Sequence, residues 1–469
     1  MFIGRKSELD RLNSLYETQS FQFPVIYGRR RIGKTTLLNE FSKNKQSIHF
    51  TAIESNSVQN LENLSKAIFG YSLNSTNTPT FKSFQDAFEY VFSLAEDYRL
   101  LFIIDEYPYL AKAEKSVASI LQNLIDKYKD TSKLFLILCG SSMSFMEEHV
   151  LGYNSPLYGR RTAQFKIQPF NFFESREYFK NFTNIEIAKI YAIVGGTPQY
   201  LNQINDLNSI EDNIKSNFLN PNSYLFEEPR NLLLQEVRDP STYNAIINAI
   251  ANGCTKLSET ASKVQIETSA CSIYINNLMS LGIIKKEVPF GETSSRKSIY
   301  IISDNLFRFW YRFIPSNFSI IQNGLINLAY NEVNKNFDTY MGPAFEEISK
   351  QFLWELNKSG NTPFTFTNLN RWWGNDPIRK CEAEIDIMGS DGANSAIFCE
   401  CKWSNEKTDY QVLEKLVLRS TLFNYQSNYF YLFSKSGFTS SCIEKAKSLN
   451  NTYLISFDDM ISWYDNAQK

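Results

Sequence analysis

Histidine, paired cysteines and long apolar runs are all scarce in this sequence. Only two histidines occur in 469 residues, so a zinc site at the one close cysteine pair, Cys399 and Cys401, is disfavoured. The seven cysteines are odd in number and irregularly spaced, which indicates reduced thiols rather than a disulfide framework. No stretch approaches the roughly 18 uninterrupted apolar residues of a membrane span, and the N-terminus lacks the apolar core of a signal peptide. We therefore expect a cytoplasmic protein with no membrane partner.

An excess of either charge is also missing. The 48 basic and 50 acidic residues leave a formal charge of -2, which argues against a protein coated in positive charge. Any contact with nucleic acid would then depend on local patches such as residues 29–31. The chain is too long for one ordinary core, and its hydrophobic content of 43% indicates several globular domains.

A glycine-rich segment at residues 28–36 fits the pattern G-x-x-x-x-G-K-[ST] and follows an apolar run at 23–27. This order predicts a strand, a phosphate-binding loop and a helix whose free N–H groups face the anion. Lys34 would reach the terminal phosphates and Thr35 would supply a magnesium ligand, whereas the structural alternative is a glycine turn beside a basic helix. The candidate ATP-binding residues are Gly28, Arg29, Arg30, Arg31, Ile32, Gly33, Lys34, Thr35 and Thr36.

Two further strands are predicted to end in polar residues at the same sheet edge. Residues 100–106 form an apolar run that ends in Asp105, a candidate magnesium ligand, and Glu106, a candidate to polarise the attacking water. Residues 134–138 precede Ser141, which is either a sensor of the γ-phosphate or part of a plain turn. Arg160 and Arg161 follow on a glycine turn, and one of them would stabilise phosphate charge unless both are solvated surface residues.

The order of these motifs resembles the archaeal-type P-loop ATPases of the STAND/AAA+ group. The resemblance rests on G-R-R-R-I-G-K-T-T-L, I-I-D-E-Y-P-Y-L, L-C-G-S-S, G-R-R-T and G-G-T-P-Q-Y-L. It implies ATP and Mg2+ as ligands. In such proteins the opening F-I-G-R segment lies against the adenine, and a glycine-proline motif in the lid closes over the base. Gly196 and Pro198 are the candidates for that motif here.

Residues 236–315 are predicted to form a winged helix. Helical patterns at 243–251, 256–264 and 269–281 precede β runs at 283–288 and 297–302, with a polar wing at 290–297. The third helix offers Ser272, Tyr274 and Asn276 to DNA. It carries almost no positive charge, so weak DNA contact and a regulatory or packing role both remain open.

The last domain contains an acidic strand pair. Residues 384–388 and 396–403 read as two strands joined by a short turn, which brings Asp386 beside Glu400 and sends Glu400 and Lys402 to one face. This arrangement resembles the PD-(D/E)xK nuclease fold. The resemblance implies that Asp386 and Glu400 ligate magnesium, that Lys402 orients the attacking water and that Glu346 on an upstream helix completes the site. A strand hairpin with surface charges is the structural alternative.

The predicted fold is therefore α/β and multidomain. It comprises a parallel-sheet P-loop ATPase core at 1–165, a helical lid at 166–235, a winged helix at 236–315 and a nuclease-like α/β domain at 316–469. The leading function is ATP binding and hydrolysis coupled to processing of nucleic acid, DNA rather than RNA, in defence or mobile-element control. One alternative is a nucleotide switch that binds DNA or a protein partner through an inactive last domain. A chaperone-like remodeller, which would need ring assembly, is the third class.

Overall fold

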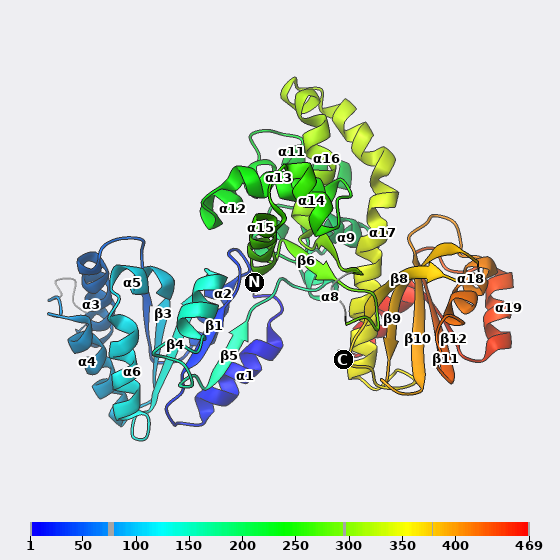
Figure 1. Cartoon of the computed structure of the whole chain (residues 1–469). Helices are drawn as coiled ribbons and strands as arrows, with labels where there is room; N and C mark the ends of the chain where they lie inside the picture. Colours follow the sequence, from blue (N-terminus) through cyan, green and yellow to red (C-terminus); the bar gives the residue numbers. More distant parts are fainter. Residues whose placement is uncertain (1, 74–78, 294–296, 378, 468–469) are drawn as a thin grey trace. The chain divides into compact units, whose positions relative to one another are not determined.

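The computed structural model describes residues 2–73, 79–293, 297–377 and 379–467 (Figure 1). The chain packs into two compact units. The first comprises Met1–Pro169 and Thr197–Gln199, and the second comprises Phe170–Gly196 and Tyr200–Lys469. The short segment belongs with the first unit because the Gln199 N–H donates to the Arg31 carbonyl oxygen at 3.4 Å. The four domain boundaries drawn from the sequence stay a prediction.

The first unit is built on a five-stranded sheet in the order β2-β3-β4-β1-β5, and all four strand pairs are parallel. Apolar residues run almost without interruption through the central strands, as expected of a parallel sheet covered on both faces. The strands are β1 (Pro24–Tyr27), β2 (Ser47–Thr51), β3 (Leu100–Asp105), β4 (Leu134–Gly140) and β5 (Ala163–Lys166). Because β4 lies between β1 and β3, the ends of these three strands meet at one edge.

Helices cover both faces of this sheet. Leu12 of α1 and Leu37 of α2 pack with Ile26 on one face, whereas Leu64 of α3 and Leu121 of α6 belong to the core on the other. The helices of this unit are α1 (Lys6–Glu17), α2 (Lys34–Ser42), α3 (Ser57–Leu73), α4 (Phe84–Asp97), α5 (Tyr107–Ala113), α6 (Val117–Tyr128) and α7 (Met143–Phe145), followed by a helical turn at Met146–Val150.

The second unit begins with short helices that pack on two long ones. Residues of α9, α16 and α17 share one large apolar core. Phe309 and Phe313 of α16 lie in this core, whereas Phe307 and Tyr311 lie in a second core. The helices are α8 (Phe172–Ser175), α9 (Asn184–Val194), α10 (Pro198–Leu201), α11 (Ile210–Phe218), α12 (Tyr224–Glu236), α16 (Asn305–Gln322) and α17 (Ile326–Lys358), with a helical turn at Arg176–Tyr178.

Three helices and an antiparallel hairpin stand between α12 and α16, in the order expected for the predicted winged helix. They are α13 (Pro240–Ala251), α14 (Leu257–Val264), α15 (Thr268–Ser280), β6 (Ile284–Glu287) and β7 (Ile299–Ile302). Residues 294–296 of the predicted wing lie outside the described residues. The ring of Tyr274 in α15 packs edge-on against the ring of Tyr243, with 4.8 Å between the ring centroids. The Tyr274 ring therefore packs against the core of this module. Asn276 is exposed.

The C-terminal part of the second unit is a separate α/β layer structure. Its five-stranded sheet has the order β12-β11-β10-β9-β8. Residues of α17 and α20 pack on one face and residues of α18 and α19 on the other. The elements are β8 (Asn370–Asp376), β9 (Cys381–Ser390), β10 (Ser395–Lys402), α18 (Tyr410–Ser420), β11 (Ser427–Ser434), α19 (Ser440–Leu449), β12 (Thr452–Ser456) and α20 (Phe457–Ala467). Within the described part of the chain, no helix is both long and apolar enough to span a membrane.

Candidate functional site

The predicted phosphate-binding loop joins β1 to α2, and both of its glycines are required by the backbone. Gly28 has no room for a side chain, because a Cβ there would lie 2.5 Å from the carbonyl oxygen of Ile167. Gly33 caps α2 with a φ of +85°, a conformation that favours glycine. The helix therefore begins at Lys34 and directs its first N–H groups toward the loop.

Lys34 is buried inside this loop. Its Nζ donates to the carbonyl oxygens of Gly28 at 2.9 Å and Arg29 at 3.0 Å. Burial lowers the pKa of Lys34, an effect that the nearby Cys139, Glu106 and Asp105 partly offset. A desolvated ammonium that donates to two carbonyl oxygens is suited to bind an anion such as a terminal phosphate.

Walker-type residues from three elements converge at the carboxyl edge of the sheet. The Thr35 hydroxyl of α2 donates to Asp105 Oδ2 at 2.8 Å, and the Glu106 N–H donates to Asp105 Oδ1 at 2.9 Å. Glu106 has a φ of +52°, uncommon for a residue with a side chain. The Ser141 hydroxyl, which follows β4, donates to Glu106 Oε2 at 2.8 Å. The structure thus assembles all four residues that the sequence selected.

Magnesium fits the Thr35 and Asp105 pair. A hydroxyl and a carboxylate are hard oxygen donors, and their hydrogen bond of 2.8 Å places them together beside the loop. Thr35 and Thr36 are both exposed, so the Thr35 hydroxyl is open to a ligand.

The arginines of the loop differ in their surroundings. The Arg30 Nη2 donates to the Tyr109 hydroxyl of α5 at 2.9 Å. Sequence reasoning missed Tyr109, although it belongs to the quoted I-I-D-E-Y-P-Y-L motif. Arg31 has a φ of +73°, and the Ile32 carbonyl oxygen accepts a hydrogen bond from the buried Arg5 at 3.0 Å. The F-I-G-R segment therefore supports the loop through its arginine.

Arg160 and Arg161 require a correction. Both precede β5, which runs parallel to β1 with Ala163 beside Pro24, so they lie at the amino edge of the sheet. The phosphate-binding loop follows the opposite, carboxyl end of β1. Arg160 is instead paired with Asp126 through two hydrogen bonds of 2.9 and 2.6 Å, which raise its pKa. The structure does not bring either arginine to the loop of its own chain.

The two predicted lid residues have different environments. A Cβ on Gly196 would lie 1.8 Å from the carbonyl oxygen of Phe170, so the backbone approach there requires glycine. Pro198 lies beside the loop, with its Cγ 3.6 Å from the Cβ position of Gly33. Closure of this motif over a nucleotide base stays a prediction.

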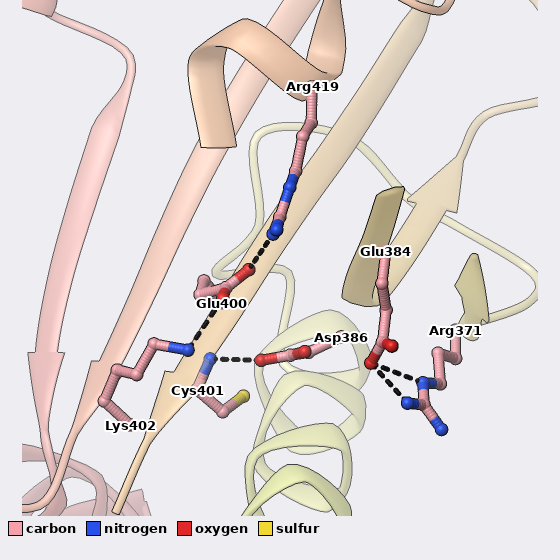
Figure 2. Close-up of polar contacts among 7 residues, drawn as sticks. All are labelled: Arg371, Glu384, Asp386, Glu400, Cys401, Lys402 and Arg419. Carbon is pink, nitrogen blue, oxygen red and sulfur yellow. Dashed lines mark hydrogen bonds and ion pairs between the residues drawn. The ribbon is translucent and has the colours of Figure 1, made fainter. Parts of the chain in front are cut away.

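A second polar cluster lies in the C-terminal domain (Figure 2). The antiparallel register of β9 and β10 pairs Ile387 with Cys399 and so leads to Asp386 opposite Glu400. Asp386 Oδ2 accepts from the Cys401 N–H at 2.8 Å, and Glu400 Oε1 accepts from Lys402 Nζ at 2.7 Å. The predicted trio of Asp386, Glu400 and Lys402 therefore comes together.

Arg419 of α18 is a member of this cluster that sequence reasoning missed. Its Nη1 donates to Glu400 Oε2 at 3.1 Å (Figure 2). No local sequence pattern predicts the contact between Arg419 and Glu400, because Arg419 lies 19 residues beyond Glu400 on another element. A second arginine, Arg371 of β8, is hydrogen-bonded to Glu384 of β9 beside the same cluster (Figure 2).

The carboxyl groups near this cluster are difficult to ionise. Burial, followed by the charge of Glu400, raises the pKa of Asp386 to about 7. Burial, followed by the charge of Asp386, raises the pKa of Glu346 to about 8, despite the opposing effect of Arg371. The carboxylates of Glu384 and Glu287 add smaller contributions of the same sign to Glu346. Such mutual repulsion would be relieved by a bound cation.

The three proposed metal ligands do not form a complete set. Among the residues that the structure describes, no three His, Cys, Asp or Glu side chains are placed to hold one metal ion. Asp386 and Glu400 lie at opposite positions of the neighbouring strands β9 and β10, whereas the described residues do not assemble Glu346 with them into one three-ligand group. Cys399 and Cys401 pack into the apolar core on the α17 side, where burial raises their thiol pKa values. This environment suits reduced core thiols.

The fold and the first cluster define a class: a parallel-sheet P-loop ATPase unit joined to a separate C-terminal α/β domain. Residues 2–204 match a family described as an ATPase domain predominantly from Archaea. Residues 310–413 match a family described as archaeal and bacterial proteins of unknown function. An uncharacterized protein of Methanocaldococcus jannaschii is 34% identical over 409 residues, which are 87% of this chain and 88% of that protein. The chain belongs to this family of archaeal-type ATPases.

Two further similarities are more limited. A second Methanocaldococcus jannaschii protein, named as ATP-binding, is 41% identical over 46 residues, which are 10% of this chain and 78% of that protein. The solved Walker-type ATPase of Pyrococcus abyssi is 20% identical, covers 66% of this chain and 96% of its own, and has a TM-score of 0.47.

Proposed function

We propose that this protein binds and hydrolyses ATP and that its nucleotide state controls a metal-dependent, nuclease-like site acting on nucleic acid. The observation that carries the nuclease part is the cross-strand placement of Asp386 and Glu400 with Lys402 Nζ 2.7 Å from the Glu400 carboxylate. Phosphodiester cleavage needs negative groups that hold a cation and a cationic group beside the reacting phosphate. This cluster provides both.

Each residue of the ATPase cluster has a separate role in the proposal. Lys34 exchanges its two carbonyl partners for negatively charged phosphate oxygens. These charge-assisted hydrogen bonds compensate for the water contacts that burial removed. Thr35 and Asp105 hold magnesium, which supplies positive charge to the phosphates. Glu106 accepts a proton from the attacking water, and the Ser141 hydroxyl holds its carboxylate at 2.8 Å.

The C-terminal cluster acts on a phosphodiester in this proposal. Asp386 and Glu400 hold a divalent cation, and the cation's charge would relieve the repulsion that raises the pKa of Asp386. Lys402 orients the nucleophilic water and contacts the scissile phosphate. The helices and hairpin between 240 and 302 form a winged helix, which favours DNA over RNA as the substrate.

A nucleotide-dependent switch with an inactive last domain is the second candidate. Glu400 is held by two cations, Lys402 at 2.7 Å and Arg419 at 3.1 Å. The described residues also hold no group of three metal-ligating side chains. A cluster neutralised by its own basic residues would bind DNA or a protein partner without cutting it.

Cleavage and metal binding by the full chain distinguish these two functions. Wild type, Asp386→Ala and Lys402→Ala are incubated with ATP, magnesium or manganese, and single-stranded DNA, double-stranded DNA or RNA. We expect both variants to lose cleavage and only Asp386→Ala to lose the cation-induced rise in melting temperature. Glu382→Ala, an exposed acid on the same strand, is the matched control. A wild type that cuts none of these substrates and shows no cation-induced shift would establish the switch.

A further inference from the structure

The segment after β6 leaves its own module and packs into the C-terminal domain. Phe290 is 7% exposed and belongs to the same apolar cluster as Ile385, Met388 and Phe398. Its N–H donates to the carbonyl oxygen of Arg371 at 2.9 Å. Arg371 lies at an irregularity in the pairing of β8 with β9, where the backbone groups of a strand are not all paired with the neighbouring strand. The segment therefore attaches to the outer strand of the C-terminal sheet.

Charged residues of β6 lie near α17 and the acidic cluster of the C-terminal domain. Lys285 Nζ lies 3.8 Å from Glu347 of α17 and 2.9 Å from Glu287. Glu287 in turn acts electrostatically on both Glu346 and Arg371. The hairpin thus adds a carboxylate to the border of the acidic cluster.

We propose that β6 and the segment that follows it as far as Phe290 form an autoinhibitory cover of the C-terminal site. While Phe290 is docked, the Glu287 carboxylate adds negative charge near Glu346 and Arg371, which disfavours a polyanionic backbone. Nucleic acid binds once this segment has left. This proposal rests on the nucleic-acid function proposed above.

The attachment is limited enough to be reversible. Among the residues that the structure describes, it includes the Phe290 side chain, one backbone hydrogen bond and one ion pair between side chains that are 41% and 43% exposed. An exposed ion pair contributes less than a buried apolar side chain, so Phe290 is the main anchor and the Lys285–Glu347 pair is a weaker second one. A conformational change in the α13–α15 module would pull on that anchor directly, because β6 follows α15 in the chain.

The test uses the full chain with Phe290→Ala and Lys285→Ala, and with Lys286→Ala as the matched control. Lys286 is an exposed lysine on the same strand, so its loss removes the same charge. Hydrogen exchange of the backbone amide of residue 290, which donates to the Arg371 carbonyl oxygen, reports docking, and fluorescence anisotropy with labelled double-stranded DNA in EDTA reports access. We expect exchange roughly tenfold faster in Phe290→Ala. DNA affinity should be about threefold or more higher in Phe290→Ala, roughly twofold higher in Lys285→Ala and not higher in the control.

The outcomes separate the autoinhibitory contact from the proposed nuclease activity. Unchanged exchange in Phe290→Ala, or faster exchange without tighter DNA binding, would overturn the autoinhibitory contact. If Phe290→Ala fails to fold, Lys285→Ala decides, since it leaves the apolar core intact. Released variants that bind DNA more tightly but cut neither DNA nor RNA with metal and ATP would reject the nuclease and keep the cover. Cleavage by a wild type in which the residue 290 amide stays protected throughout would reject the cover alone.

Discussion

Replacing Asp386 by Asn should stabilise the C-terminal domain, and the gain should grow with pH. Burial and the charge of Glu400 raise the pKa of Asp386 from its ordinary value of 3.8 to about 7 in the folded chain. Between these two values the folded state binds more protons than the unfolded state, so stability falls as the pH rises. The cost is absent below about pH 4 and complete above about pH 7.

The size of the effect follows from the same two pKa values. The interval between 3.8 and about 7 corresponds to roughly 4 kcal/mol at about 1.36 kcal/mol per pKa unit, which is an upper limit because charges near the surface are screened. Asn keeps an oxygen that can accept from the Cys401 N–H, but its amide group needs a new partner at a cost of about 1–3 kcal/mol. We therefore expect a net gain of about 1–3 kcal/mol at pH 8 and about 2 kcal/mol less at pH 5.

Hydrogen exchange of peptides from β9 and β10 measures this gain in the full chain. Variant and wild type are compared in EDTA at each pH, so the intrinsic exchange rate cancels. Glu382→Gln, at an exposed position of β9, should change protection at neither pH. Equal protection of Asp386→Asn and wild type at pH 8 would refute the raised pKa of the buried Asp386 carboxyl group. The same gain in protection at pH 5 and pH 8 would also refute it.

Three further changes probe the ATPase unit. Lys34→Ala should abolish ATP binding measured by calorimetry, because it removes the ammonium that donates to the Gly28 and Arg29 carbonyl oxygens and would reach the phosphates. Unchanged affinity would contradict this role. Glu106→Gln should keep ATP affinity but release phosphate at least roughly 100-fold more slowly, and loss of binding would show that the roles are misassigned. Arg160→Ala should cost less than about 1 kcal/mol of stability and leave the ATPase rate of dilute protein unchanged, since it pairs with Asp126 at the amino edge. A tenfold fall in that rate would contradict its placement at the far edge.

The sequence by itself determined the chemistry that lies in contiguous residues. The loop around Lys34 needs glycines at fixed offsets, and the apolar run before Asp105 specifies a buried strand that ends in a carboxylate. Alternation along residues 396–402 likewise separates Glu400 from its cysteine neighbours. These features depend on local periodicity and backbone geometry, and the structure places them as predicted.

The position of Arg160 was also encoded, although the prediction placed it at the phosphates. Residues that precede a parallel strand lie at its amino end, and the loop follows the carboxyl end of β1. Strand direction alone was therefore enough to separate them.

Only the tertiary structure decided which distant elements became neighbours. The insertion of β4 between β1 and β3 brings Ser141 to Glu106, and the packing of α18 on β10 brings Arg419 to Glu400. The burial of Phe290 in a core built from another domain is of the same kind. Such contacts depend on the order of strands in a sheet and on which apolar faces meet. Many arrangements of the same helices and strands would satisfy the local pattern, and long-range packing selects among them.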